Sequence, residues 1–300
     1  MRTSLLICTL FTSGILLFAA SARAENSSPV YALGLGFDIT RGTFGSTTTN
    51  TFVSTPVIID WFPTTRLDFE LTVPMYYQQL THNGNASSGT SSAKVTARGP
   101  LGGAGSTMAG TGSTIGGTGT ASTVSSSSGT GGGGGVLGGD YGMGDVTLTS
   151  GYALLEDGDS SLLLRPTLYV KFPTADTDKG FGTGKLDFGA GLAVSKWLGS
   201  WQPFAEGRYI VQGASHADTG ALNFLTVDAG VTYGWTERLA TSVYTRTGSA
   251  LFDGMSAPLE ARLKMSWRFG KKTYTDAYVL KGFGDGSPDY GGGVAVFAEF

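Results

Sequence analysis

The sequence predicts an all-β protein: a transmembrane antiparallel β-barrel of about twelve strands, with one long disordered outer loop rich in Gly and Ser. Three observations support this fold class. Apolar and polar residues alternate in short runs, the connections between runs are tight and long in turn, and the tryptophans gather beside the tight connections. A period of two is the pattern of a strand, because successive side chains of a strand point to opposite faces.

The N-terminal residues predict a cleaved export signal, residues 1–24, that precedes a barrel domain of residues 25–300. Arg2 supplies a positive start, residues 5–20 form an apolar run, and Ala22-Arg23-Ala24 fits the small-x-small rule for cleavage. The alternative is a membrane anchor, but the run is short for a spanning helix. We therefore expect the segment to be removed.

Composition excludes several function classes. Charged residues make up 14% of the chain, against about 25% in ordinary soluble domains, which fits an exterior in contact with lipid. The single cysteine, Cys8, lies in the predicted signal, so the mature chain has no thiol for a metal, a disulfide or a lipid. The sequence has no clustered basic surface with aromatic stacking platforms, which disfavours nucleic acid as a partner.

Twelve runs of strand character follow, each close to the roughly 9 to 11 residues that a tilted strand needs to cross a bilayer. They span residues 31–40, 52–61, 66–77, 145–154, 162–172, 186–197, 201–211, 224–235, 238–247, 259–269, 273–281 and 292–300. The clearest is the tenth, in which every second residue from Leu259 to Phe269 is apolar, and the least clear is the eleventh, where Asp276 blurs the two faces. Periodicity alone does not say whether the apolar face lies inside, as in a soluble sandwich, or against lipid.

The connections and the tryptophans favour the barrel. Tight connections contain residues 63–65, 156–161, 198–200 and 270–271, and long polar ones contain 174–185, 212–223, 248–258 and 282–290. Outer-membrane barrels combine short periplasmic turns with longer extracellular loops in this way. The tryptophans at strand ends beside the tight turns predict an interfacial girdle in contact with outer-membrane lipid. They are Trp61, Trp197, Trp201, Trp235 and Trp267.

The last run ends in Phe300, with Val294, Val296 and Ala298 on the same face. An alternating last strand with a terminal phenylalanine resembles the signal that the barrel assembly machinery recognises. We therefore expect Phe300 to be an assembly signal and the chain to be located in the bacterial cell outer membrane.

Residues 83–139 are dominated by Gly, Ser and Thr. Such a segment cannot bury a core, so we expect a disordered extracellular loop between the third and fourth runs. Its length costs little closure entropy. We interpret the loop as a tolerated insertion; the alternatives are a surface decoration and a flap that folds into the pore.

Catalytic and metal-binding motifs are missing from the sequence. Only His82 and His216 could act as a base, and both are predicted in loops without a matching Ser or carboxylate. Residues 180–185 superficially look like a phosphate loop, but Leu186 stands where a Ser or Thr would hold magnesium, so we interpret them as a flexible outer loop. The acidic run 176–178 could bind a cation only weakly. We therefore expect no enzyme activity, cofactor or metal.

Charged residues fall on the polar face of nearly every run, and these are the candidate lumen residues, because a charge that faces mid-membrane lipid is costly. They are Asp38, Asp60, Asp68, Glu70, Asp145, Arg165, Lys171, Asp187, Glu206, Arg208, Asp228, Arg246, Arg262, Lys264 and Arg268. Acidic residues prevail in the first four runs and basic residues in the ninth and tenth, which would lie opposite in a ring of about twelve. We expect a transverse field across a pore, with Arg246, Arg262 and Lys264 facing Asp68 and Glu70. The alternative is a network of paired charges that fills a narrow barrel and conducts nothing.

Several segments resemble a known family. Residues 142–148 read GMGDVTL, residues 170–176 read VKFPTAD, a glycine-rich stretch follows at 179–185, and residues 65–74 read TRLDFELTVP. These are similar to outer-membrane transporters named for the meta-cleavage pathway of phenol degradation. The likeness covers most of the mature chain, although residues 83–139 depart from it. It implies a phenolic or other small aromatic solute.

The sequence thus favours a passive channel for small organic solutes, lined by the charges above. A structural or surface-interaction barrel without transport is the second interpretation. A barrel hydrolase is the third, and it lacks a catalytic motif.

Overall fold

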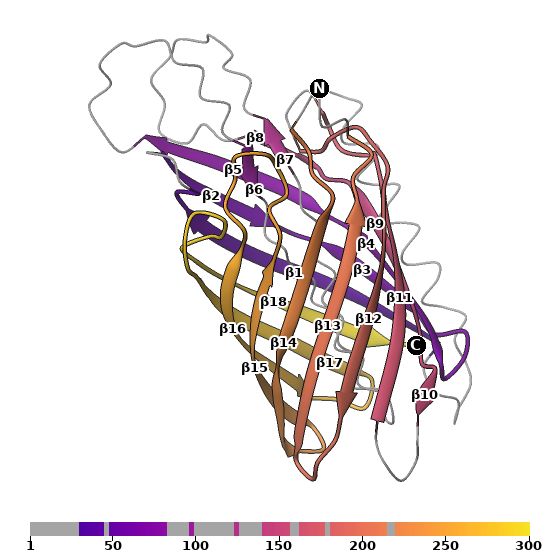
Figure 1. Ribbon diagram of the computed structural model, residues 1–300. Coiled ribbons are helices and arrows are strands. Elements are labelled where there is room, and N and C mark those ends of the chain that lie inside the picture. The colour runs from indigo at the N-terminus through magenta and orange to yellow at the C-terminus, as the bar shows by residue number, and fades with distance from the viewer. Residues whose placement is uncertain are drawn as a thin grey trace, which may run out of the picture.

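The computed structural model describes residues 30–44, 48–82, 96–98, 123–125, 140–156, 162–177, 181–214 and 220–300. Every regular element in these ranges is a β-strand, and the strands form a tilted barrel (Figure 1). No helix in the described ranges is long and apolar enough to cross a membrane. The predicted signal, residues 1–24, lies outside the described residues and stays a prediction.

The strands follow the predicted runs closely, and from β11 onward each holds 10 to 13 residues, enough to cross a bilayer when tilted. In chain order they are β1 (Tyr31–Gly42), β2 (Thr48–Ser54), β3 (Val57–Trp61), β4 (Leu67–Val73), β5 (Met75–His82), β6 (Thr96–Arg98), β7 (Thr123–Ser125), β8 (Asp140–Met143), β9 (Val146–Tyr152), β10 (Leu155–Glu156), β11 (Leu162–Phe172), β12 (Asp187–Lys196), β13 (Trp201–Val211), β14 (Phe224–Thr236), β15 (Leu239–Gly248), β16 (Leu259–Arg268), β17 (Thr273–Gly282) and β18 (Tyr290–Glu299).

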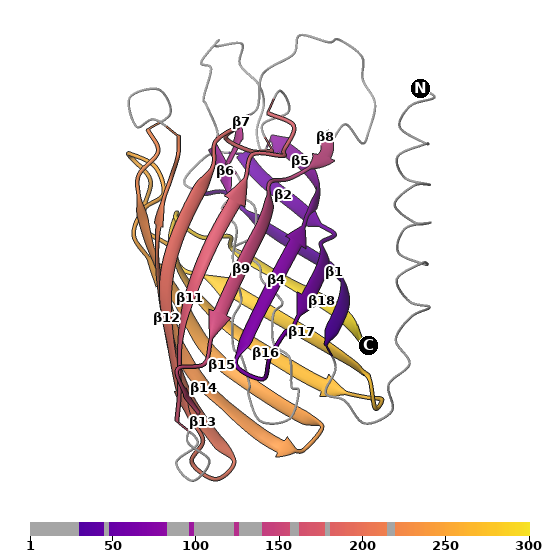
Figure 2. The same cartoon turned by 90° about the vertical axis from the view of Figure 1, so that its right-hand side faces the viewer.

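Twelve strand positions pair antiparallel and close on themselves, which confirms the predicted fold class. β18 pairs with β1 along ten residue pairs, so the sheet has no free edge at this seam (Figure 2). A side-chain hydrogen bond crosses the seam: the Tyr278 hydroxyl of β17 donates to Asp38 Oδ1 of β1 at 2.8 Å. It reaches over Gly293 of β18, where a Cβ would collide with the Asp38 carboxylate. The missing side chain at Gly293 therefore lets β17 and β1 join directly.

Two predicted runs are interrupted where the sequence contains proline. The second run divides into β2 and β3 at Thr55 and Pro56, and the third divides into β4 and β5 at Pro74. Proline has no N–H to donate to a ladder. Its carbonyl still accepts: Pro56 O receives Gly36 N at 2.9 Å, and Pro74 O receives Gly144 N at 2.9 Å. The strands are broken at these points, but the wall stays hydrogen-bonded.

The fourth predicted run is also interrupted, and the strand begins at Asp140, earlier than expected. β8 pairs with β5 and β9 pairs with β4, and between the two pairings the β8–β9 strand holds one extra residue. This β-bulge falls at Gly144 and Asp145, which are both buried. Gly144 is required because a Cβ there would collide with the ring of Tyr76. Asp145 shares the interior face with Thr147 and Thr149, and the bulge shifts the alternation of β8, in which Tyr141 is exposed.

Apolar side chains cover the outside of the barrel and polar ones the inside, which distinguishes a membrane barrel from a soluble sandwich. Leu35, Leu168 and Val243 expose 63%, 62% and 59% of their surface, whereas Arg165 and Glu206 expose 4% and 7%. Burial alternates along β16 as predicted. The face assignment that periodicity left open is therefore apolar side out.

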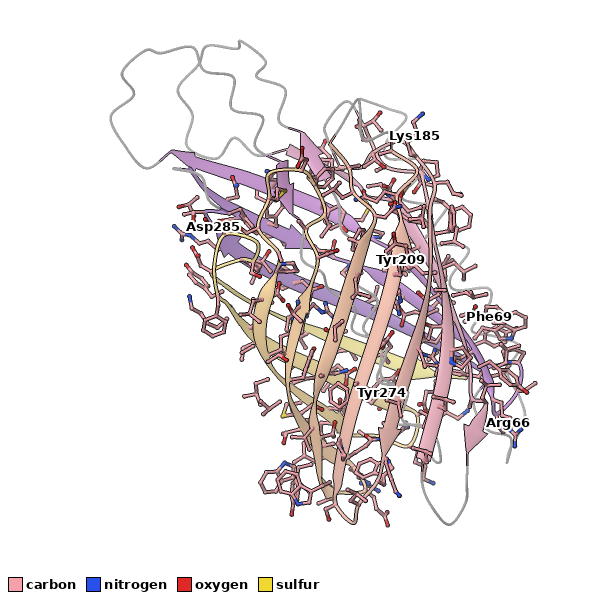
Figure 3. All side chains as sticks on the ribbon, in the orientation of Figure 1. Arg66, Phe69, Lys185, Tyr209, Tyr274 and Asp285 are labelled. Carbon is pink, nitrogen blue, oxygen red and sulfur yellow. The ribbon has the colours of Figure 1, made fainter. Side chains whose placement is uncertain are left out.

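Tight turns lie at one end of the barrel and long connections at the other, so that Arg66 lies far from Lys185 and Asp285 (Figure 3). Beside the tight turns, Trp61, Trp201, Trp235 and Trp267 are exposed. The Trp61 ring stacks on those of Tyr31 and Phe69, at centroid distances of 6.4 and 5.2 Å. Trp197 differs, since it is half-buried. Four of the five tryptophans are thus exposed beside the tight turns, and their role in an interfacial girdle stays a prediction.

Of the segment predicted to be disordered, residues 83–139, the structure describes only β6 and β7, which pair with each other where the sequence predicts no strand. The rest lies outside the described residues, and its disorder stays a prediction. The strands on either side keep their pairing across the insertion, β4 with β9 and β5 with β8 (Figure 2).

Candidate functional site

The interior of the barrel carries ion pairs, some within one strand and others between strands. All seven basic residues predicted for the lumen take part, each with a carboxylate oxygen at 3.1 Å or less. The pairs are Arg165 with Asp68, Lys171 with Asp145 and Asp187, Arg208 with Glu206, Arg246 with Asp228, Arg262 with Glu260, Lys264 with Asp276, and Arg268 with Glu299. Such charges are tolerated away from bulk water because each has an opposite partner.

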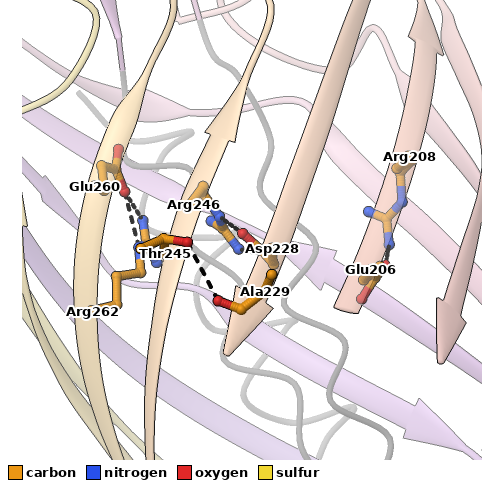
Figure 4. Close-up of polar contacts among 8 residues, drawn as sticks. All are labelled: Glu206, Arg208, Asp228, Ala229, Thr245, Arg246, Glu260 and Arg262. Atoms are coloured by element: carbon orange, nitrogen blue, oxygen red, sulfur yellow. Dashed lines mark hydrogen bonds and ion pairs between the residues drawn. The ribbon is translucent and has the colours of Figure 1, made fainter. Parts of the chain in front are cut away.

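Four successive strands place charged residues directly opposite one another. Glu206 of β13 faces Asp228 of β14, which faces Arg246 of β15, and Arg246 faces Glu260 of β16. Arg246 Nε and Nη2 donate to the two Asp228 oxygens at 2.7 and 2.6 Å, a bidentate contact (Figure 4). Arg262 donates to Glu260 Oε2 from Nε and Nη2, at 2.9 and 2.7 Å. Because opposite residues share a face, these side chains form one charged belt on the interior.

The belt corrects the transverse arrangement expected from the sequence. The basic residues of β15 and β16 pair with carboxylates on their own strand or one or two strands away, and not with Asp68 and Glu70 across the barrel. Coulomb attraction falls with distance, so carboxylates nearby in the sheet are favoured over those on the far side of the barrel. Three of the carboxylate partners, Glu260, Asp276 and Glu299, are missing from the residues predicted for the lumen. The period-two pattern of the sequence was the signal that could have placed these three carboxylates on the interior face.

Lys171 connects several segments at the long-connection end of the barrel. Its Nζ lies 3.1 Å from Asp145 Oδ2 and 2.7 Å from Asp187 Oδ2, and it donates to Thr183 Oγ1 at 3.1 Å. Asp145 Oδ1 in turn accepts from Ala175 N at 3.0 Å. Lys171 and Asp145 are each 1% exposed, so this cluster ties β11, the bulge, β12 and the β11–β12 connection together in the interior.

The segments that resemble the transporter family meet at this cluster. Thr174 Oγ1 donates to Gly144 O at 3.2 Å and accepts from Val146 N at 2.8 Å. Phe181 is fully buried against Gly142, where a Cβ would leave too little room for the ring. Phe181 and Thr183 therefore pack inward, which corrects the expectation of a flexible outer loop at these two residues, whereas Gly184 and Lys185 are exposed. Residues 178–180 lie outside the described ranges.

Two further long connections pack onto the interior. Gln212 Nε2 donates to Leu222 O at 2.7 Å and to Leu251 O at 2.9 Å, which joins the β13–β14 connection to the β15–β16 connection. Leu251 and Phe252 then pack in one buried cluster with Tyr169 of β11 and with Ile210 of β13. The sequence predicts both connections as polar loops, and their apolar residues cap the interior at this end.

Aromatic side chains occupy the interior together with the charges. Phe52 and Tyr76 form one buried cluster with Phe181, and Tyr274 and Phe297 belong to another, with ring centroids 4.6 Å apart. Guanidinium groups lie over three interior rings at 5.3 to 5.7 Å from the centroid. These pairs are Arg208 over Tyr169, Arg262 over Tyr278, and Arg268 over Tyr274. The interior thus offers apolar ring faces beside polar groups.

The remaining predicted residues differ in their surroundings. Asp38, Asp60 and Glu70 lie on the β1, β3 and β4 wall, whose described interior charges are all acidic.

Within the described residues, no group of three or more His, Cys, Asp or Glu is placed to hold a metal ion. His82 ends β5 instead of lying in a loop, and His216 is outside the described ranges.

A closed barrel with an apolar exterior, aromatic residues beside its tight turns and a charged interior defines the class: an outer-membrane β-barrel, located in the bacterial outer membrane. Among solved structures, the fold is similar to an outer membrane channel from Pseudomonas putida F1, with a TM-score of 0.59 and 13% identity over 94% of this chain and 98% of that chain. This likeness concerns the fold alone.

Two further structures are similar at a lower level. The KdgM porin matches with a TM-score of 0.45 and 7% identity over 90% of this chain and 99% of that chain. The CymD monoaromatic hydrocarbon channel matches with a TM-score of 0.41 and 11% identity over 91% of this chain and 89% of that chain. No family model and no curated protein matches the sequence. The resemblance to the phenol-degradation transporters therefore stays a prediction.

Proposed function

We propose that this chain is a passive outer-membrane channel for small organic solutes, including aromatic ones, and that it carries out no catalytic step. The observation that supports the proposal is the mixed interior. Aromatic faces such as those of Phe52 and Tyr274 lie among polar groups on the interior of the barrel. A barrel that only anchors loops needs no apolar rings inside.

An amphipathic solute loses contacts with water when it enters a channel, so the channel wall must offer comparable contacts along the whole passage. Ring faces replace the apolar hydration, and guanidinium groups held over aromatic rings, as Arg262 is over Tyr278 at 5.3 Å, provide both kinds of contact at one place. Weak contacts of several kinds allow a solute to enter and also to leave. The charged residues named above are the proposed pore lining.

The second candidate is a structural barrel without transport, and one observation favours it. All seven interior basic residues are paired, and three long connections pack inward. Paired charges can brace a barrel without conducting ions.

Single-channel recording of the purified protein in planar bilayers separates the two candidates. The channel predicts discrete conductance steps in potassium chloride and faster swelling of vesicles in phenol or benzoate than of vesicles without protein. Protein that has been boiled, and has thereby lost its folded barrel, is the control. Bilayers with verified insertion that never conduct would support the structural barrel.

We also propose the orientation, with the tight turns in the periplasm and the long connections outside. A protease site placed at Asp285, in the β17–β18 connection, should be cut on intact cells, whereas the same site at Thr64, between β3 and β4, should be protected. Equal cleavage at both positions would contradict this orientation. The length asymmetry of the connections supports it.

Phe300 is proposed as the residue that the barrel assembly machinery recognises. Its N–H donates to Tyr31 O at 2.8 Å and its carbonyl accepts from Val30 N at 3.0 Å, so the last residue still pairs with the first strand. Deletion of Phe300 should lower the amount of folded, heat-modifiable protein in the outer membrane. Substitution by Tyr should preserve it, and normal assembly of the deletion variant would remove this role.

A further inference from the structure

The exterior of the barrel carries two basic residues close together at the end with the long connections. Arg41 of β1 and Lys281 of β17 are both exposed, and each is opposite Tyr290 of β18, which lies between them. Neighbouring strands are about 4.8 Å apart, so two strand spacings separate the basic residues by about 10 Å. Arg41, Tyr290 and Lys281 therefore form one row across three strands, which we call the basic row.

Charged residues are rare on this surface. In strands β1 to β5, β9 and β11 to β18, the exterior positions hold only one further charged residue, Lys196 at the tight-turn end of β12, and no carboxylate. A charge that faces lipid is costly at mid-membrane and much less so at the interface. Arg41 and Lys281 each stand one residue from the end of their strand, and Tyr290 begins β18. The basic row thus lies at the border of the apolar exterior.

The basic row has no counter-charge within the protein. In the described ranges neither Arg41 nor Lys281 has an ion-pair partner, unlike the seven basic residues of the interior. Like charges in one row repel each other, and an anion between them is attracted by both. Tyr290 is 54% exposed, and its hydroxyl adds a donor between the two cations. The basic row is therefore complementary to a group with more than one negative charge, such as a phosphate.

The connection between β17 and β18 leaves the basic row uncovered. Pro288 of this connection is buried. A Cβ on Gly42 or Gly282, the residues that follow Arg41 and Lys281, would collide with the backbone of Pro288. The connection therefore packs against the buried side of both strand ends and holds them in place, while the basic row stays exposed on the other side.

An apolar notch lies next to the basic row, toward the tight-turn end. The next exterior row on the same three strands consists of Ile39, Gly292 and Val279. Ile39 and Val279 expose 43% and 59% of their surface, whereas Gly292 between them has no side chain. Two exposed aliphatic side chains that flank a glycine leave a notch whose walls a hydrocarbon chain can contact. Phosphate-binding and chain-binding features are thus adjacent on the exterior.

We infer that the basic row and the notch at Gly292 form an exterior binding site for a phosphorylated, multiply acylated glycolipid of the outer leaflet, of the lipid A type. In the proposed orientation the basic row lies at the level of the lipid headgroups. Phosphate oxygens accept from Arg41, Lys281 and the Tyr290 hydroxyl, and one acyl chain lies in the notch. The site goes beyond the proposed channel function, because it concerns the lipid around the barrel and not the solute inside it.

Native mass spectrometry of the full mature protein in a non-ionic detergent tests the site, with bisphosphorylated lipid A as the probe and divalent cations removed by a chelator. Lipid A without its phosphates keeps the acyl chains, and inorganic phosphate carries charge without chains. We expect saturable binding of lipid A, and binding about tenfold or more weaker for the other two compounds.

The charges of the basic row are tested by substitution of exposed side chains. Arg41→Gln with Lys281→Gln should raise the dissociation constant of lipid A about tenfold or more, whereas Arg41→Lys with Lys281→Arg should keep most of the affinity. Lys196→Gln is the matched control, because Lys196 is an exposed exterior lysine at the opposite end of the barrel. Lipid A binding to this control should equal that of the unmodified protein. Heat-modifiable migration verifies that each variant is folded.

The notch is tested by Ile39→Ala with Val279→Ala, which removes its two walls and leaves the charges in place. This variant should bind lipid A more weakly than the unmodified protein. An affinity equal to that of the unmodified protein would overturn the assignment of the acyl chain to the notch.

The remaining outcomes are equally decisive. Unchanged lipid A affinity in the Arg41 and Lys281 glutamine variant, equal binding of lipid A without phosphates, or an equal loss in Lys196→Gln would each overturn the site. Displacement of lipid A by inorganic phosphate would contradict a lipid as the occupant. Binding in detergent depends neither on conductance nor on orientation, so conductance without lipid A binding would remove the site and leave the proposed channel standing.

Discussion

The two walls of the barrel are built differently. From β11 to β17 the strands are continuous, and basic residues lie among carboxylates that neutralise them, as in the pairs of Arg246 and Arg262. From β1 to β9 the strands are interrupted at Pro56, at Pro74 and at the Gly144 bulge, and the interior holds neutral amides and acidic residues. Both walls have the same exterior.

The difference separates two tasks within one sheet. Paired charges on the continuous wall satisfy one another, so they contribute rigidity and leave little bonding capacity for a solute. On the interrupted wall, the neutral side chains of Thr40, Asn50 and Gln78 hold buried atoms without partners, and such atoms lower stability wherever they occur, including at Thr167, Gln202 and Tyr274 of the continuous wall. We therefore expect the removal of one buried polar side chain to lower the free energy of unfolding on the continuous wall, at a paired charge, and to leave it unchanged or raise it on the interrupted wall, at a neutral amide.

The largest effect is expected on the continuous wall. Arg262→Met leaves Glu260 buried without its main partner, with the carboxylate side chain only 2% exposed, and should cost about 3 to 5 kcal/mol of unfolding free energy. Denaturant unfolding in detergent measures it. The double variant with Glu260→Met removes both charges and should recover most of the loss. A matched change on the other wall, Asn50→Leu, should be neutral or stabilising, and equal losses on both walls would break the comparison.

An intermediate effect is expected where the two walls meet. Gly144→Val adds a side chain that collides with the Tyr76 ring at the bulge, and should cost about 1 to 3 kcal/mol of unfolding free energy. Adding Tyr76→Ala to that variant should restore part of the stability, because it opens space. Gly207 of β13, which has open space around its Cβ position and no positive φ, is the contrasting glycine. If Tyr76→Ala brings no rescue, steric conflict at the bulge is not the cause.

The smallest effect is expected on ion preference. The interrupted wall carries only acidic interior charges on β1, β3 and β4, so the proposed channel should favour cations slightly. Glu70→Gln should reduce that preference, seen as a reversal potential closer to zero under a potassium chloride gradient. Asp285→Asn, in a connection outside the strands, should change it less. A shift in the opposite direction would show that the acidic wall does not set the local potential.

The sequence predicts the continuous wall better than the interrupted one, for a physical reason. A strand such as β16 that contacts lipid on one face and paired charges on the other alternates strictly, so Leu259 to Phe269 could be assigned from period alone. Proline cannot donate to a ladder, so Pro56 and Pro74 marked possible breaks, but proline alone does not decide, because β11 and β13 continue through Pro166 and Pro203. The bulge at Gly144 and Asp145 had no signal in the period-two pattern.

The site was harder to predict because its partners are distant in the sequence. Candidate basic residues were found from their polar face, but their pairing depends on register, which placed Asp228 beside Arg246 and Glu260 beside Arg262. The inward packing of Phe181 likewise depends on strands far from it. Neutral residues such as Asn50 carry no charge to mark them, so the sequence alone did not indicate which of them lie together on the interior.

The hydrogen bond between Tyr278 and Asp38 joins residues 240 positions apart in the chain. Contacts of such long separation form late, because most of the chain must be ordered before its two ends can meet. Until they meet, the sheet has two edges whose N–H and C=O groups cannot be left bare in hydrocarbon. A fragment that stops before β17 has neither the tyrosine nor the partner strand for β1. The smallest unit that can be stable in the bilayer is therefore the closed ring of strands from β1 to β18, whatever the length of the connections between them.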